Sequence, residues 1–217
     1  MKNIVKFSKI AISGVLAAAL LSNCQSTKAL SEADKASIHK VYVNTHVDMP
    51  AKPYVQTRGD VWAMALGGAI GGVIAGANMS KEDQALQFLN ANKISVDQML
   101  RNDFIHHLKK TGNFTVVNSP SLADAQFDLK VLVYGIGQNG NAFSNKYRTF
   151  MSTEGSLSKN GGNVVWKNNG ICTAIDGDRP QSTLDELFTQ PATMRKHMEA
   201  LTQATSYKLS QNIAAKK

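Results

Sequence analysis

Hydrophobic and polar residues alternate from residue 38 onward, which predicts a strand at the start of the folded domain. A period of two is typical of a strand with one buried face. The side expected to be buried consists of Val41, Val43, Thr45 and Val47. Pro50 and Pro53 follow, and proline, which has no N–H to donate, ends the strand before them.

Two amphipathic helices are predicted next, at residues 80–90 and 96–110. Ser95 and Gln98 have the spacing of a capping box at the start of the second helix. Gly112 follows its last turn, where a left-handed residue commonly ends a helix. The apolar residues of this helix keep to one face: Val96, Met99, Leu100, Phe104 and Leu108.

Four further strands and two helices complete the pattern. The predicted strands are residues 114–117, 127–134, 146–157 and 163–175. In the second of them, one face is expected to hold Phe127, Leu129, Val131 and Val133, and the reverse face Leu132 and Tyr134. Asn160 and Gly161 form a dipeptide that favours a hairpin turn between the last two. Thr183 begins a short helix that ends at Pro191, and the final helix covers residues 192–213. The order predicts a single α/β (α+β) domain over residues 38–217, with a mixed or antiparallel sheet of about five strands covered by helices.

Residues 61–77 form an uncharged, glycine-rich apolar segment. Its closely spaced glycines are Gly67, Gly68, Gly71, Gly72 and Gly76. Gly68, Gly72 and Gly76 recur at every fourth position, which on a helix makes a smooth stripe where another backbone can approach. Such a glycine-zipper helix would be about 26 Å long, slightly shorter than the hydrocarbon core of a bilayer. The stripe could join protomers or the membrane, or pack onto the sheet of its own chain.

The N-terminus has the features of a secretory signal peptide over residues 1–23. Three lysines precede an apolar run at residues 10–21, which is too short to span a bilayer comfortably. The run ends in Leu21-Ser22-Asn23-Cys24, which resembles the lipobox of bacterial lipoproteins. The resemblance implies that Cys24 is acylated, and residues 24–37 are then expected to form a lipidated tether. Because Gln25 rather than aspartate follows, the outer membrane is the expected location. The alternative is an ordinary signal peptide, with Cys24 as a free thiol.

Composition narrows the class of protein. A chain of 217 residues that is 43 % hydrophobic and 18 % charged is neither a polytopic membrane protein nor a disordered chain. The formal net charge of +8 falls to +5 without the signal peptide, which holds three lysines and no acid. An exported basic protein meets anionic lipids and glycolipids rather than nucleic acid. Cys172, the second cysteine, is expected to be a buried thiol.

The sequence contains no nucleophile elbow, phosphate-binding loop or metal-ligand spacing, so we expect neither an enzyme nor a bound metal or other cofactor. Asp176 and Asp178 are expected in a plain turn rather than in a calcium loop. The histidines are scattered, and we expect packed or solvated roles for them: His39, His46, His106, His107 and His197.

Arg58-Gly59-Asp60 is the tripeptide that integrin ligands use, which raises the hypothesis of a surface adhesin. A structural interpretation is also available, because Gly59 suits a turn and Asp60 an N-cap. Trp62 and Trp166 are expected in the core or at an interface.

Several stretches together resemble a known family. These stretches are the lipobox, the C-terminal helix and three segments between them, which read "LKKTGNFTVV", "ADAQFDLKVLVYGIG" and "GGNVVWK". This organisation, over about residues 38–213, resembles the small envelope lipoproteins of the ABC-transport-auxiliary type. Their fold is similar to the periplasmic domain of the curli-secretion channel lipoprotein. The resemblance implies a non-enzymatic transport or assembly accessory at the outer membrane. We expect it to face the periplasm, with the cell surface as the alternative. The alternatives are an oligomeric channel component joined by the glycine segment and a surface-exposed adhesin.

Overall fold

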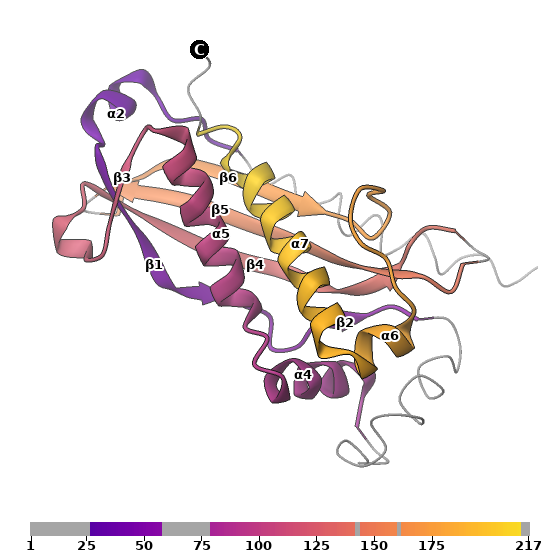
Figure 1. Ribbon diagram of the computed structural model, residues 1–217. Coiled ribbons are helices and arrows are strands. Elements are labelled where there is room, and N and C mark those ends of the chain that lie inside the picture. The colour runs from indigo at the N-terminus through magenta and orange to yellow at the C-terminus, as the bar shows by residue number, and fades with distance from the viewer. Residues whose placement is uncertain (1–26, 58–78, 142–143, 160–161, 214–217) are drawn as a thin grey trace, which may run out of the picture.

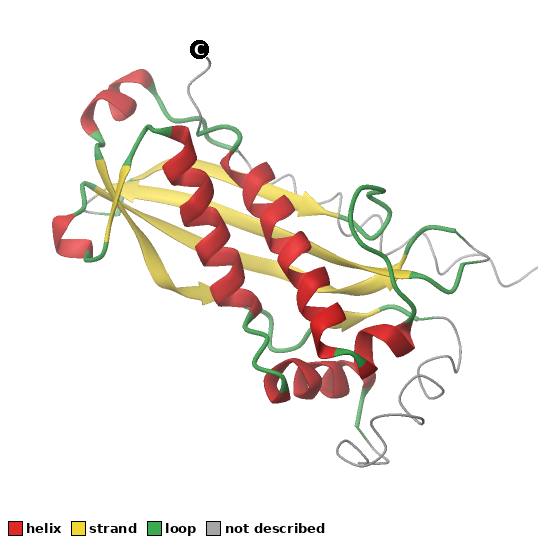
Figure 2. Ribbon diagram, in the orientation of Figure 1, coloured by secondary structure: helices red, strands yellow, loops and turns green. Residues whose placement is uncertain are grey.

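The alternating stretches of the sequence form one mixed sheet of six strands (Figure 2). The computed structural model describes residues 27–57, 79–141, 144–159 and 162–213. The strands are β1 (Lys40–Asp48), β2 (Tyr54–Val55), β3 (Thr115–Val117), β4 (Ala125–Gln138), β5 (Tyr147–Lys159) and β6 (Val164–Cys172). Their order across the sheet is β3-β1-β4-β5-β6, and the short β2 pairs with the end of β4.

The connections between strands explain the mixed directions. β4, β5 and β6 are consecutive in the chain and pair antiparallel. β1 pairs parallel with both β3 and β4, and parallel neighbours need a crossover connection. The crossover contains α4 (Lys81–Ala91) and α5 (Val96–Thr111). A 3-10 helix, η1 (Pro120–Leu122), then connects β3 to β4.

Two long helices, α5 and α7 (Pro191–Ser210), lie side by side on one face of the sheet (Figure 1). The predicted fold class, an α/β (α+β) protein with a mixed sheet covered by helices, is therefore confirmed. α6 (Leu184–Thr189) begins with the side chains of Thr183 and Glu186 bound to each other's backbone N–H. Gly112 has φ 69°, as predicted for the end of α5.

The predicted capping box at Ser95 is wrong. The side chain of Ser95 makes no capping hydrogen bond, although its carbonyl accepts the N–H of Met99 at 3.0 Å. Ser31 and Ser80, whose side chains do cap their helices, have ψ 157°, whereas Ser95 has ψ 93°. The preceding turn contains Lys93 in the left-handed region, at φ 53°.

The core lies between the two helices and the sheet, and aromatic rings connect its layers. The rings of Phe104 on α5 and Phe127 on β4 meet edge to face at 5.3 Å, and Phe127 meets Trp166 on β6 at 5.5 Å. Trp166 is fully buried and Cys172 is a buried free thiol, as the sequence predicted.

A bulge in β4 changes the predicted face of its second half. The pairing with β5 shifts between Val131 and Val133, so that one extra residue, Leu132, interrupts the alternation. Phe127, Leu129 and Val131 face the helices as predicted. Beyond the bulge, Tyr134 and Ile136 are buried and Val133 is only half-buried, which reverses the predicted sides.

The chain before β1 is folded against the sheet. Lys28 forms a two-way backbone bridge with Lys167 on β6, with N–O distances of 2.8 and 2.9 Å. Leu30 is buried, and α2 (Glu32–Ser37) follows it. Lys159 binds Asp34 of α2 at 2.6 Å. The expectation that the whole stretch 24–37 is a tether is therefore wrong from Lys28 onward, because backbone pairing and burial hold that part.

Several predicted features lie outside the described residues: the signal peptide, Cys24, the tripeptide Arg58 to Asp60, Trp62 and the glycine segment at 61–77. In the part of the chain that the structure does describe, no helix is long and apolar enough to cross a membrane.

Candidate interaction surface

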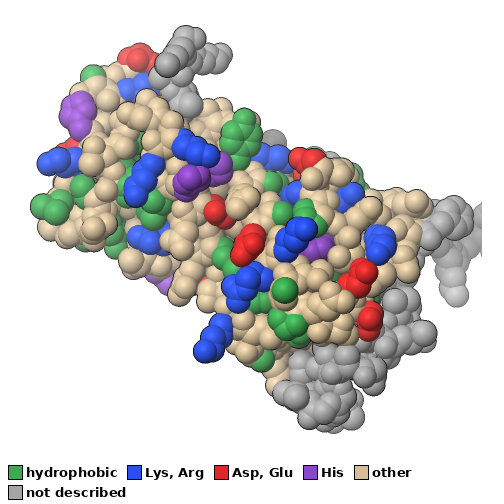
Figure 3. All heavy atoms as spheres, viewed as in Figure 1, with side chains coloured by type: hydrophobic (Ala, Val, Ile, Leu, Met, Phe, Trp, Pro, Cys, Tyr) green, Lys and Arg blue, Asp and Glu red, His purple; other side chains and the backbone are tan. Residues whose placement is uncertain are grey.

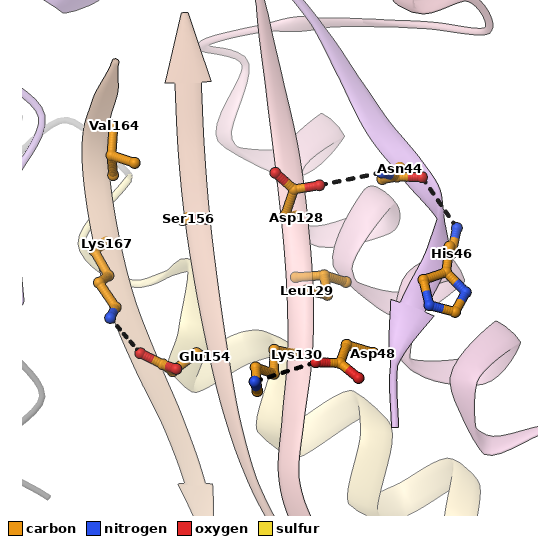
Figure 4. Close-up of a pocket in the computed structure, with 10 residues that line it drawn as sticks. All are labelled: Asn44, His46, Asp48, Asp128, Leu129, Lys130, Glu154, Ser156, Val164 and Lys167. Atoms are coloured by element: carbon orange, nitrogen blue, oxygen red, sulfur yellow. Dashed lines mark hydrogen bonds and ion pairs between the residues drawn. The ribbon is translucent and has the colours of Figure 1, made fainter. Parts of the chain in front are cut away.

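The face of the sheet opposite the helices carries a polar groove of about 360 Å³ (Figure 4). Side chains from β1, β4, β5 and β6 line it. Antiparallel sheets can leave one face to solvent, which places polar residues at alternate positions of each strand. Asp128 and Lys130 on β4 follow this rule, since both are exposed while Leu129 between them is buried.

The groove depends on an irregular segment of β1. Val43 pairs with Phe127 and Val47 with Leu129, so β1 contains two more residues than β4 over this interval. The insertion changes the predicted alternation, because Thr45 is exposed while Val43 and Val47 remain buried. The extra length brings Asn44 to the rim of the groove.

Arg101 of α5 fixes this irregular segment from the helix side of the sheet. Its Nε donates to the carbonyl of Asn44 at 2.9 Å, and its Nη2 donates to the carbonyl of Val43 at 3.0 Å. A bulged strand leaves carbonyls without a partner in the ladder, and a charged donor satisfies them strongly. Arg101 therefore holds the backbone that positions the groove.

On the groove side, Asn44 links two strands. Its Nδ2 donates to Oδ1 of Asp128 at 3.2 Å, and its Oδ1 accepts the backbone N–H of His46 at 3.1 Å (Figure 4). Both ends of the amide are thus engaged. Asn44 keeps Asp128 on β4 aligned with the end of β1.

Two ion pairs cross between strands of the groove. Asp48 and Lys130 are direct neighbours on β1 and β4, with an N–O distance of 3.2 Å. Glu154 on β5 and Lys167 on β6 are 2.5 Å apart and less exposed. Exposed pairs of this kind contribute about 0 to 1 kcal/mol each, so they determine which charges a partner meets more than they stabilise the fold.

The charged groups of the groove are paired between neighbouring strands. Each acid of the groove is hydrogen-bonded or ion-paired to a neighbour on the next strand, and the acids do not converge on one point. Within the described ranges, no group of three or more histidine, cysteine or acidic side chains could hold a metal ion. A groove with alternating charges suits a polar partner whose own groups can replace these pairs.

A second hollow of about 550 Å³ lies where the end of β1 meets α4 and the start of α5. Its lining combines apolar and polar residues, and the hydroxyl-bearing Ser95 and Tyr134 contribute to it. Tyr134 is 4 % exposed, and burial, together with the negative charge of Asp97, raises its pKa to about 12. Its phenol is therefore neutral at physiological pH.

The structure places the other candidate residues away from both hollows. The ring of His106 meets that of His107 at 5.8 Å on α5, and His107 meets Tyr207 of α7 at 5.7 Å. Burial lowers the pKa of His107. Asp176 closes the predicted turn, since its carboxylate accepts the N–H and hydroxyl of Thr173.

Charges on the helix side are mixed in sign. Figure 3 shows basic and acidic side chains interspersed over the helices rather than separated into patches of one sign. The excess positive charge therefore does not form one continuous field on this face, and the positive charge alone does not define a binding site there.

The sequence did not single out the residues that build the groove. Asn44 and Asp48 lie on the first strand, but their partners, Asp128 and Lys130, lie about 80 positions later in the chain. Alternation in each strand was the available signal. The order of the strands in the sheet, which brings these polar sides together, could not be read from that alternation.

Comparisons with known proteins leave the family open. No family model matches this sequence, and no curated protein matches it either. Among solved structures, the chain is similar to PelC, a dodecamer from Paraburkholderia phytofirmans, with 12 % identity, a TM-score of 0.41 and coverage of 88 % of this chain and 96 % of that one. A Xanthomonas campestris protein of the family model DUF330 has 11 % identity and a TM-score of 0.43. The match covers 78 % of this chain and 82 % of that one. A lipoprotein candidate from Caulobacter crescentus has 17 % identity and a TM-score of 0.36. The match covers 55 % of this chain and 80 % of that one. At these values the likeness identifies neither a family nor a function. The resemblance to ABC-transport-auxiliary lipoproteins stays a prediction.

Proposed function

We propose that this protein is a lipid-anchored interaction protein of the bacterial outer membrane, a non-enzymatic accessory in envelope transport or assembly. Acylated Cys24 holds it, with the folded domain on the periplasmic side. The groove on the open sheet face binds a partner of mixed charge. The groove is the observation that carries the proposal, because its acids and bases are matched across strands and it opens to solvent.

Attachment is tested first and separately. Mass spectrometry of the native protein should show a mature chain that begins at Cys24 and carries acyl groups. Globomycin should block its processing, and Cys24→Ala should leave the precursor uncleaved. A mature chain with an unmodified thiol at Cys24, partitioning into the aqueous phase of Triton X-114, would refute the anchor.

Partner binding is tested by photocrosslinking in intact cells. Ser156 lines the groove, so a photoreactive amino acid at this position should give a discrete crosslinked product. The same amino acid at Gln98, exposed on α5, is the matched control on the helix side. Asp48→Lys together with Glu154→Lys should remove the product, because both changes reverse a charge that the partner meets. Products from Gln98 and none from Ser156 would contradict the groove as the binding surface.

A further inference from the structure

The bridge between Lys28 and Lys167 determines where a lipid at Cys24 can be. Lys28 is held against the middle of β6 by its two backbone hydrogen bonds. Its Nζ also donates to the carbonyl of Val164 at 2.5 Å. The described part of the chain therefore begins at the edge of the sheet that β6 forms (Figure 1).

The length of chain before this point is short. Three residues lie between Cys24 and Lys28, and over these four Cα–Cα steps even a fully extended chain spans at most about 14 Å. An anchor at Cys24 would keep the β6 edge within this distance of the lipid headgroups. The opposite edge is four strand spacings away, which is about 19 Å across the sheet.

The side chains along the β6 edge fit such a position. Ile171 at the end of β6 is 46 % exposed, and Ile175 in the following turn is 67 % exposed. Lys208 of α7 donates from Nζ to the carbonyl of Ile171 at 2.8 Å and pairs with Asp176 at 3.1 Å. Exposed aliphatic residues beside long lysine side chains are typical of surfaces that contact lipid headgroups.

We infer that the domain lies edge-on to its membrane, with the β6 edge and its exposed isoleucines Ile171 and Ile175 against the lipid headgroups. This inference rests on the proposed acylation of Cys24. In this orientation the groove face and the helix face both stand roughly perpendicular to the bilayer. Both faces remain accessible from the side.

The orientation is tested with an environment-sensitive fluorophore on single introduced cysteines in the full acylated chain. The protein is reconstituted in phosphatidylcholine–phosphatidylglycerol vesicles that contain a lipid with a nitroxide on its headgroup. Probes at Ile171→Cys and, independently, at Ile175→Cys should be strongly quenched. A probe at Leu122→Cys should not be, since Leu122 follows β3 at the opposite edge and is 62 % exposed. Cys172 is buried, and the parent protein without an introduced cysteine shows whether it is labelled.

A spacer provides the matched control. Twelve glycine and serine residues inserted between Cys24 and Lys28 add roughly 20 Å of flexible reach. Quenching at the isoleucine positions should then fall to the level seen at Leu122. Equal quenching at the two edges in the acylated parent protein would overturn the orientation and leave the anchor intact. Absence of acyl groups at Cys24 would instead refute the proposed function.

Discussion

The guanidinium of Arg101 on α5 donates to the main-chain carbonyl of Asn44 at 2.9 Å, and so connects the helix layer to the irregular segment of β1. On the other side of the sheet, the amide of Asn44 binds Asp128. A residue in the helix layer thereby supports a surface that it does not touch.

Replacing Arg101 should destabilise the fold and disturb the groove. Arg101→Ala removes two charged hydrogen bonds to carbonyls, which contribute about 1.5 to 3 kcal/mol each at most. We expect a loss of roughly 2 to 4 kcal/mol in the free energy of unfolding, measured by urea denaturation. Gln98→Ala on the same helix should change it by less than about 0.5 kcal/mol. Equal stability of the two variants would show that the carbonyls find other donors.

A glycine in β6 allows α7 to approach the sheet closely. A Cβ at Gly170 would lie 2.6 Å from the carbonyl oxygen of Thr205, which is backbone and cannot move alone. Gly170→Ala should therefore lower the free energy of unfolding by about 1 to 3 kcal/mol. Gly177→Ala is the control, because a Cβ there meets nothing within 4 Å. An unchanged urea midpoint for Gly170→Ala would mean that α7 shifts at little cost.

Stability should fall in mild acid because of His197. Burial, together with the positive charges of Lys196 and Arg179, lowers the pKa of His197 from 6.5 to about 4. The unfolded chain takes up the proton with the ordinary pKa while the folded chain does not, so acidification below pH 6.5 favours unfolding. The loss is about 2 kcal/mol between about pH 7 and pH 5.

The measurement is a series of urea denaturations across that pH range, with His197→Gln as the comparison. The variant should lose most of this dependence. It keeps the smaller contributions of His107, whose lowered pKa acts in the same direction, and of Asp103, whose pKa burial raises. A variant with the same pH slope as the parent protein would contradict the assignment to His197.

The glycine segment keeps its two interpretations, which one substitution distinguishes. If the stripe joins protomers, Gly72→Leu should reduce the size of the oligomer in light scattering and leave thermal melting unchanged. If the stripe packs onto its own sheet, the same change should lower stability by about 1 to 3 kcal/mol without altering size. Gly177→Leu, in an open turn, should do neither.

Local patterns predicted most of the fold because they arise from local physics. The alternation around Phe127, the left-handed Gly112 and the cap at Thr183 each depend on a few neighbouring residues. The predicted faces of Thr45 and Tyr134 were wrong, because each residue lies at or after an irregularity that exists only in the pairing with another strand.

The groove could not be predicted for the same reason. Its alignment requires Asn44 and Asp128, which are far apart in the chain, to be neighbours across the sheet. The folded start at Lys28 also depends on a distant partner, Lys167. Polar composition alone made this segment resemble a linker.

The parallel pairing of β1 has a consequence during synthesis. β1 ends at Asp48, but its neighbours begin only at Thr115 and Ala125. A chain that emerges from its N-terminus first therefore exposes an apolar strand without hydrogen-bonding partners until more than sixty further residues have followed. β4, β5 and β6 are adjacent in sequence and can therefore pair with one another soon after they emerge. Until β1 joins them, the nascent chain is open to aggregation, and a chaperone that binds extended apolar segments would protect it at this stage.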